Sequence, residues 1–329
     1  MQTVWYDAPS HTAGAALAAH LDVRATGVRA TGVQAAGVPA IDVRATGVRV
    51  RAEDLTVVAA AARELGLSEG TARTLSVQIE AADPPAIQAF WDLMAGAPII
   101  PVRRLAELRP LRNRIHVDVV RPRDEVLRAR GKREPSGPFG VMLADDEGNE
   151  VDLVPGDPLP GTTDWYALFS PMVHYPNAPR RLVTTAAELA DAAGIPLQLD
   201  VRPEGLTIAG RKDTWETDPA FLVLAQQIEG AAKDLGLRAD PAPLRFVQFG
   251  IDALDVPAVR AFWTGFLGYE RDSRPDVTDI YDPRDLNPVL FFQQLREPRP
   301  QRNRIRFELA GRNRCLVTDP EGNEALAGT

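Results

Sequence analysis

The sequence predicts an α+β protein that is internally duplicated. Three short motifs occur twice in the same order: Ala-Phe-Trp at 89–91 and 261–263, Arg-Asn-Arg-Ile at 112–115 and 302–305, and Glu-Gly-Asn-Glu at 147–150 and 321–324. Around them, some segments carry apolar residues at helical spacing, and others alternate apolar and polar residues as half-buried strands do. Because both kinds of segment recur in both halves, we expect the halves to share one mixed fold.

Length and composition limit the class of protein. A chain of 329 residues is longer than a usual domain of about 100–200 residues, and the duplication favours an even number of units. Hydrophobic residues make up 45% and charged residues 25% of the chain, which is typical of globular proteins. Nucleic-acid binding requires a clustered basic surface, so the net charge of −8 with only short basic runs disfavours a nucleic-acid partner.

The single cysteine and the N-terminus bear on the compartment. Cys315 has no second cysteine with which to form an intrachain disulfide, so we expect a reducing, cytoplasmic environment. We expect Cys315, in an apolar strand, to be buried. The N-terminus lacks the pattern of a signal peptide, and no run approaches the ~18 apolar residues of a membrane span, so the sequence predicts no membrane partner.

The first half begins with a helix and an unusual repeat. Residues 14–21 read as a helix, and units resembling Val-Arg-Ala-Thr-Gly-Val then recur up to residue 50. Only the last unit leads into a further element, so we predict a strand at 41–51 and interpret the earlier units as a loop-like insertion. Asp54 then precedes a helix over 55–65 that Gly66 ends.

Strand-rich segments follow the first helical module and return in the second half. Alternating residues predict strands at 75–80, 115–119 and 150–153, with helices at 84–94 and 123–130. The second half repeats this order, with helices at 186–193 and 218–235, a hairpin at 199–208, a strand at 247–252, a helix at 257–267 and added strands at 279–282 and 289–293. With a Pro- and Gly-rich linker at 156–163, the order predicts four modules, 1–72, 73–156, 157–240 and 241–329.

Two of these modules resemble a known superfamily. A strand followed by Asp-x-Pro, Phe-Trp, Asn-Arg-Ile-His-x-Asp and Asp-Glu-Gly-Asn-Glu, at 73–156 and more loosely at 241–329, resembles the glyoxalase-like branch of the vicinal oxygen chelate superfamily, which includes bleomycin-resistance-like proteins. The resemblance implies paired βαβββ modules whose sheets curl around a ligand cleft. It also implies that the repeated motifs form a scaffold and that any chemistry lies on strand faces where the copies differ.

The other two modules are similar to pterin-4a-carbinolamine dehydratase, a small fold with helices on one side of an antiparallel sheet. The similarity rests on residues 188–196, on Leu-Asp-Val-Arg at 199–202 and on the helix that follows. Active dehydratases carry His-His-Pro where this chain has Gly194-Ile195-Pro196, and His20 lies outside such a motif. Because dehydration needs an imidazole as acid and base, the resemblance implies a degenerate module.

The glyoxalase-like resemblance implies a metal site in the first copy. Family members hold a divalent metal ion through His, Gln or Glu side chains on strands that face the cleft. His116 and Asp152 fall on two such positions, Ser76 stands at the first-strand position, and Gln78 is the nearest substitute on its face. Alternation also places in the predicted cleft Glu80, Asp118 and Glu150. The alternative is a polar cleft without metal, in which His116 bonds Asp118 or Glu150.

The second copy departs from this pattern. Gln248 fits the first-strand position, but Arg306 and Leu326 occupy the other two. A guanidinium has no lone pair to offer a metal ion, so we expect no metal there.

The sequence therefore predicts a protein that binds a small organic molecule, including a sequestering or resistance protein, and leaves open whether it is an enzyme. One alternative is a metal-dependent lyase or dioxygenase-type enzyme that uses the first glyoxalase-like module. Another is a 4a-hydroxytetrahydropterin dehydratase. No cofactor is certain, a divalent metal ion is the candidate, and the sequence leaves a monomer and a homodimer open.

Overall fold

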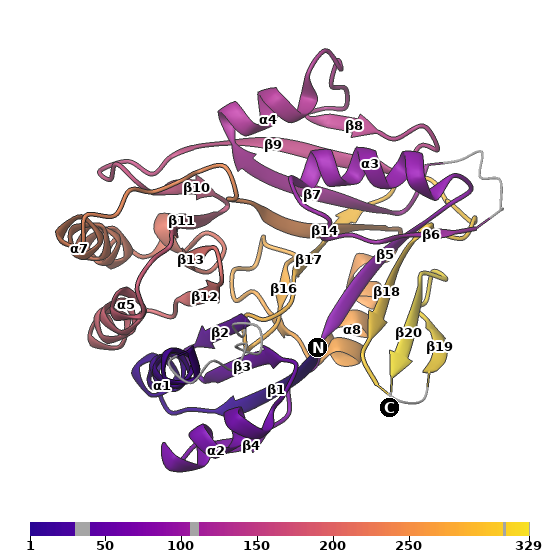
Figure 1. The fold of residues 1–329 in the computed structure, drawn as a ribbon. Helices are drawn as coiled ribbons and strands as arrows, with labels where there is room; N and C mark the ends of the chain where they lie inside the picture. The colour runs from indigo at the N-terminus through magenta and orange to yellow at the C-terminus, as the bar shows by residue number, and fades with distance from the viewer. Residues whose placement is uncertain (30–39, 106–111, 312–313, 329) are drawn as a thin grey trace. The chain divides into compact units, whose positions relative to one another are not determined.

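The computed structural model describes residues 1–29, 40–105, 112–311 and 314–328 and divides the chain into two compact units. Unit 1 consists of residues 1–72 and 156–244, and unit 2 consists of residues 73–155 and 245–329. Helices and sheets occur in both units, which confirms the predicted α+β class (Figure 1). None of the described helices combines the length and the apolar character needed to cross a bilayer.

Unit 1 is an antiparallel sheet with helices on one face. Its strands lie in the order β10-β11-β13-β12-β2-β3-β1-β4, and Figure 1 shows α7, α5, α1 and α2 along one side of them. The elements are β1 (Gln2–Asp7), α1 (His11–Arg29), β2 (Ala40–Arg44), β3 (Gly47–Ala52), α2 (Thr56–Glu64), β4 (Ser68–Gly70), β10 (Tyr166–Leu168), β11 (Ser170–Pro176), α5 (Arg180–Ala193), β12 (Gln198–Arg202), β13 (Gly205–Ala209), α6 (Thr214–Thr217) and α7 (Ala220–Asp234).

The core of unit 1 follows from alternation along these strands. Ile41 and Val43 of β2 and Leu199 and Val201 of β12 are buried in one cluster with apolar residues of the helices. Since β2 and β12 pair antiparallel, the polar residues between these apolar ones lie on the face without helices. Sequence alternation in the two central strands therefore fixes which face the helices cover.

Two predictions for the first module are wrong. The strand predicted at 41–51 is a hairpin of β2 and β3, because the chain turns between Arg44 and Gly47. The residues just after 21, expected to begin a loop-like insertion, continue helix α1 to Arg29. The repeats at 30–39 lie outside the described residues.

Unit 2 contains two sheets and three longer helices among its described residues. Its elements are β5 (Leu75–Ala81), α3 (Pro84–Ala95), β6 (Val102–Arg104), β7 (Ile115–Pro122), α4 (Arg123–Arg130), β8 (Met142–Ala144), β9 (Glu150–Pro158), β14 (Phe246–Ala253), α8 (Val256–Leu267), β15 (Glu270–Arg271), β16 (Ile280–Tyr281), β17 (Val289–Gln294), β18 (Ile305–Leu309), β19 (Arg314–Thr318) and β20 (Glu324–Gly328). The last residues of β9 belong to unit 1.

Each sheet of unit 2 combines strands from both of its chain segments. One sheet has the order β17-β14-β7-β9-β8, extended beyond β17 by β16 and β15, and the other has the order β6-β5-β18-β20-β19. The pairing is equivalent: β14 pairs parallel with β17 and antiparallel with β7, while β5 pairs parallel with β6 and antiparallel with β18. The first strand of each segment therefore lies beside later strands of the other segment.

The repeated motifs hold helices and turns together. Trp91 donates its indole N–H to Asp145 at 3.0 Å, and Trp263 donates to Asp319 at the same distance. Both tryptophans are buried in the apolar core. Each aspartate also accepts backbone N–H groups of the turn that contains the Glu-Gly-Asn-Glu motif. The buried indole of each Ala-Phe-Trp motif is therefore hydrogen-bonded to the turn of the Glu-Gly-Asn-Glu motif.

The arginines of the second motif connect the two segments. Arg304 pairs with Glu147, whose carboxylate also accepts the backbone N–H groups at the start of α3. Arg114 donates to Asn323 at 3.0 Å in the equivalent turn. Both arginines are buried, and these contacts are consistent with a structural role for the motif.

The prediction that Cys315 is buried is wrong, because Cys315 is exposed on β19. This strand is at the edge of its sheet, where an apolar sequence does not ensure burial.

Candidate functional site

Strands β7 and β14 place polar side chains on the face of the first sheet opposite the core. In β7, Ile115 and Val117 enter the apolar core while His116 and Asp118 point to the other face. Gln248 of β14 lies directly opposite Asp118, and Gly250 lies opposite His116. Gln248 donates its amide N–H to Asp118 at 2.8 Å. The site is therefore shared by the two chain segments of unit 2.

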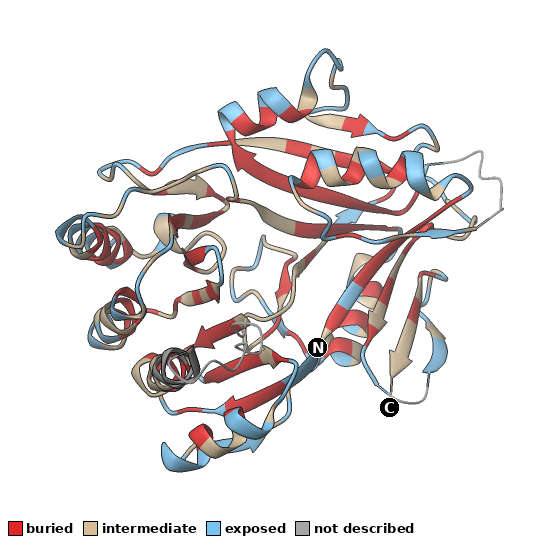
Figure 2. Cartoon of the chain, in the orientation of Figure 1, coloured by how far each residue is buried: buried red, intermediate tan, exposed pale blue. Residues whose placement is uncertain are grey.

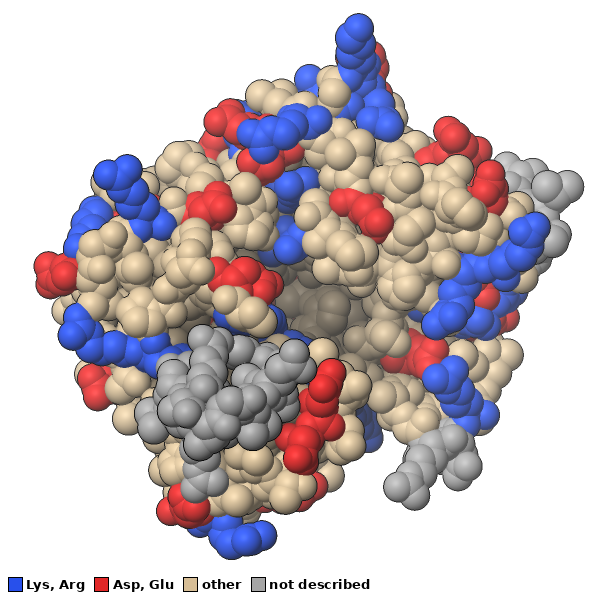
Figure 3. All heavy atoms as spheres, viewed as in Figure 1, with Lys and Arg blue, Asp and Glu red and all other residues tan. Residues whose placement is uncertain are grey.

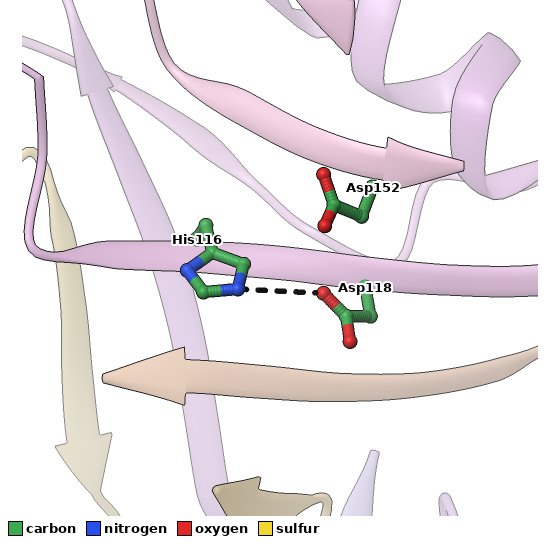
Figure 4. A group of neighbouring side chains, drawn as sticks. All are labelled: His116, Asp118 and Asp152. Atoms are coloured by element: carbon green, nitrogen blue, oxygen red, sulfur yellow. Dashed lines mark ion pairs between the residues drawn. The ribbon is translucent and has the colours of Figure 1, made fainter. Parts of the chain in front are cut away.

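His116, Asp118 and Asp152 form a compact group of potential metal ligands. One ligand atom from each of the three lies within 4.8 Å of the others. Figure 4 shows His116 and Asp118 on β7 and Asp152 on the neighbouring strand β9. The Nε2 atom of His116 is 3.6 Å from the nearer Asp118 oxygen.

Gly250 provides the space in which the His116 ring lies. A Cβ atom at position 250 would be 2.2 Å from Cε1 and 2.4 Å from Nε2 of His116, and 2.6 Å from the ring of Phe291. The Phe291 ring contacts the imidazole edge-on at a centroid distance of 5.5 Å. Gly250 was not predicted as a site residue, although a glycine between Phe249 and Ile251 inside a strand is itself a signal of close approach.

The imidazole of His116 is neutral at pH 7. Burial, together with the positive charges of Arg112 and Arg299, lowers the pKa of His116 to about 4. Its Nδ1 atom makes no hydrogen bond within the described part of the chain and lies 3.8 Å from an oxygen of Asp252. A neutral imidazole with an unused nitrogen can bind a metal ion or a ligand.

Two ion pairs account for both arginines near the site. Arg112 pairs with Glu150, and Arg299 donates to Asp252 at 2.9 Å. Burial raises the pKa of Glu150 and of Asp252, and the arginines partly oppose this effect. The two pairs cancel in formal charge.

The Asp152 carboxylate has no ion-pair partner among the described residues and lies beside His116 and Asp118. Burial raises the pKa of Asp152, which Arg112 lowers and Asp252 raises again. The Gln248 carbonyl oxygen is also buried and accepts no hydrogen bond from the described residues. Buried acceptors of this kind are stabilised by a bound cation or by a ligand with hydrogen-bond donors.

A cavity of about 200 Å³ opens over this group. Its polar part includes Arg112, His116, Glu150, Asp152 and Gln293, and its apolar part comes from the loop at 136–142. The loop contributes Pro138, Phe139, Val141 and Met142. Phe139 is 79% exposed, which leaves an aromatic ring beside a charged floor.

The donor set fits a divalent metal ion. One imidazole nitrogen and carboxylate oxygens are ligands that first-row ions such as Zn²⁺, Mn²⁺ and Fe²⁺ accept. His116, Asp118 and Asp152 would hold the ion, whose charge would offset the negative charge of the carboxylates. A bound ion would supply Lewis-acid chemistry.

The structure brings His116 and Asp152 together but places Gln78 elsewhere. Gln78 lies on β5 in the other sheet, where it accepts a hydrogen bond from Arg103 at 2.6 Å. The reason is the exchange of strands, because β14 and not β5 lies beside β7. The predicted cleft residues Asp118, Glu150 and Gln248 lie at the His116 site, whereas Glu80 and Arg306 lie in the other sheet.

The other sheet carries an ion-pair network at the equivalent position. Arg306 is 2.6 Å from Glu80, and Arg302 bridges Glu80 at 2.6 Å and Glu324 at 2.8 Å. In this sheet the guanidinium groups of Arg302 and Arg306 provide the positive charge that offsets the glutamates. Within the described ranges, the only compact group of possible metal ligands found is that of His116.

At the positions where the expected resemblance to the dehydratase would require histidines, the chain has Gly194 and Ile195. Gly194 ends helix α5 with a left-handed φ of 66°, and Ile195 is buried. His174 of β11 contacts the Thr207 hydroxyl at 2.9 Å through Nδ1.

On the face seen in Figure 3, basic and acidic side chains are interspersed.

A family model described as a glyoxalase-like domain matches residues 248–315, from β14 into β19. No curated protein matches the chain. The family match thus supports the glyoxalase-like resemblance over part of the second segment of unit 2, beginning at Gln248.

Proposed function

We propose that the chain binds a small organic molecule in the cavity over His116, and that unit 2 is a duplicated pair of glyoxalase-like modules. The observation that carries the proposal is a pair of acceptors, buried His116 and half-buried Asp152, in the lining of a cavity with an apolar wall. Such a combination of a few oriented polar groups and apolar contacts is typical of ligand sites.

The charges of the site favour a ligand that carries positive charge or hydrogen-bond donors. Arg112 and Arg299 are each paired with a carboxylate, whereas the Asp152 carboxylate, beside Asp118, has no ion-pair partner among the described residues. Burial of a negatively charged ligand beside these aspartates would be costly. The exposed Phe139 ring can contact an aromatic group or a cation of the ligand.

Two probes of similar size and opposite charge test this proposal. Calorimetric titration of metal-stripped protein with benzylammonium and with benzoate should show tighter binding of benzylammonium. Asp152→Asn should remove this preference, because it removes the negative charge that has no ion-pair partner among the described residues. Asp124→Asn, which removes a charge from the exposed side of α4, is the matched control. Equal binding of the two probes, or an equal effect of the two substitutions, would refute the proposal.

The second candidate is metal-dependent catalysis, favoured by the three ligand atoms within 4.8 Å. Elemental analysis after loading with Zn²⁺, Mn²⁺, Ni²⁺ or Fe²⁺ should give about one ion per chain in this case. His116→Ala should lose the ion, whereas His20→Ala, on α1 of unit 1, should keep it. Loading should also weaken benzylammonium binding, because the ion neutralises the aspartates. Metal-free protein after every loading would exclude this candidate and leave the binding proposal intact.

A further inference from the structure

The helix-free face of unit 1 carries a row of polar residues across six strands. The row follows from direct pairing, strand by strand. Its members, from β11 to β1, are His174, Thr207, Asp200, Asp42, Arg49 and Trp5. Residues directly opposite in antiparallel strands point to the same face, so all six share one surface of the sheet.

Asp42 at the centre of the row binds three arginines from two strands, β3 and β12. It is completely buried and accepts from Arg49 at 2.6 Å, from Arg202 at 2.5 Å and from Arg51 at 3.3 Å. Although burial acts to raise the pKa of Asp42, the surrounding arginines hold it well below its usual range. The carboxylate is therefore a permanent anion that draws three guanidinium groups to one point.

Positive charge exceeds negative charge in this cluster. Arg44 is 2.8 Å from Asp200, which also lies 3.5 Å from Arg202. The arginine cluster thus contains four arginines, Arg44, Arg49, Arg51 and Arg202, and two aspartates, Asp42 and Asp200. The Arg44–Asp200 pair cancels, and the three arginines around Asp42 leave an excess of 3 − 1 = +2 in formal charge. Figure 2 shows that the strands β2 and β3, which carry three of these arginines, are buried along most of their length.

Arg49 is the least satisfied member of the cluster. It is only 7% exposed, and within the described chain its single hydrogen bond is the one from Nε to Asp42. Its two terminal nitrogens are therefore available. Two parallel N–H groups of a guanidinium match the two oxygens of a carboxylate or phosphate, and a buried cation without full compensation is costly to keep.

We propose that the arginine cluster of unit 1 binds a small dianion, a phosphate ester or a dicarboxylate, with Arg49 as its principal contact. The anion would balance the excess of two charges and bond the terminal nitrogens of Arg49. Arg51 is two residues after Arg49 in β3, so both side chains lie on the same face of the strand. With 30% of its side chain exposed, Arg51 marks the side of the cluster that is more accessible to solvent. This site is separate from the His116 cavity, which lies in unit 2.

The test is titration of the full chain with inorganic phosphate and with succinate at pH 7 and low ionic strength. Saturable binding of one anion per chain is expected, weakened by added KCl because screening reduces charge attraction. Stronger binding of phosphate would indicate a phosphate ester as the ligand, and stronger binding of succinate a dicarboxylate.

Arg49→Gln should weaken the preferred anion by about tenfold or more, since it removes hydrogen bonds to a charged group. Arg181→Gln, the same charge change on an exposed position of α5, should bind within about twofold of wild type, as expected for a distant surface charge. If circular dichroism shows that Arg49→Gln does not fold, Arg51→Gln replaces it, with about fivefold weaker binding expected. The proposal would be overturned if neither anion binds at anion concentrations from 10-fold above that of the protein up to about 10 mM. Equal binding by the cluster variant and the control variant would also overturn it.

Discussion

Substitution of Gly250 by alanine should both destabilise unit 2 and displace His116. The added Cβ would lie 2.2 Å from the His116 ring and 2.6 Å from the Phe291 ring, whereas contacts under 3.0 Å require some group to move. Overpacking of this kind costs about 2 kcal/mol of unfolding free energy. For a unit of this size, the cost corresponds to a fall in Tm of about 4–8 °C, measured by differential scanning calorimetry.

A control and a double-mutant cycle make this prediction specific. Gly265→Ala adds the same methyl group within helix α8, where nothing lies within 4 Å, and should stabilise the protein by about 0.5–1 kcal/mol. In a His116→Ala background, Gly250→Ala should cost about 1 kcal/mol less, because the nearest clash is absent. The reasoning fails if Gly250→Ala is as stable as wild type or costs the same with and without the imidazole.

Three further predictions concern single contacts. The pKa of His116 is near 6.5 in the unfolded chain and about 4 in the native protein, so the free energy of unfolding should fall by up to about 3 kcal/mol as pH falls from about 6.5 to 4. Urea unfolding of wild type and His116→Gln across this pH range checks this, and parallel pH profiles of the two proteins would contradict it. Although burial acts to raise the pKa of Asp191, hydrogen bonds from Thr12 and His11 at the start of α1 lower it to about 2. Asp191→Ala should therefore cost about 1–2 kcal/mol of unfolding free energy above pH 4, with the difference disappearing as pH falls toward 2, and an unchanged Tm at pH 7 would exclude a role of Asp191 in capping α1. Asp145→Ala should cost about 2–4 kcal/mol because it leaves the buried Trp91 N–H without its acceptor, as chemical denaturation would show, whereas a cost below that of an average surface substitution would count against it.

Elements with a strong local signal could be predicted from the sequence. The helix over 123–130 is observed with those bounds, and the hairpin expected at 199–208 is present as β12 and β13. In both cases the residues that form the element are adjacent in the chain, so periodicity and turn residues are sufficient. The repeat after residue 21 was predicted as a loop-like insertion because only its last unit leads into a further element, whereas the described part continues a helix to Arg29.

The candidate site shows the limit of the same reasoning. Alternation places His116, Asp118 and Asp152 on the cleft faces of their strands, and the structure brings all three together. Strand alternation cannot tell which other strand lies beside β7, since pairing joins residues more than 120 positions apart. This is why Gln78 was expected at the site that Gln248 occupies, and why Gly250 was missed.

The sequence by itself determined the secondary-structure classes, the repeated motifs and the polar face of each strand, because these depend on neighbours within a few residues. Only the tertiary structure decided that β14 meets β7 and that β5 meets β18. That pairing gives one sheet a histidine, two aspartates and a cavity, and gives the other an arginine–glutamate network. The physical reason is that charge balance and space are properties of residues brought together from distant parts of the chain.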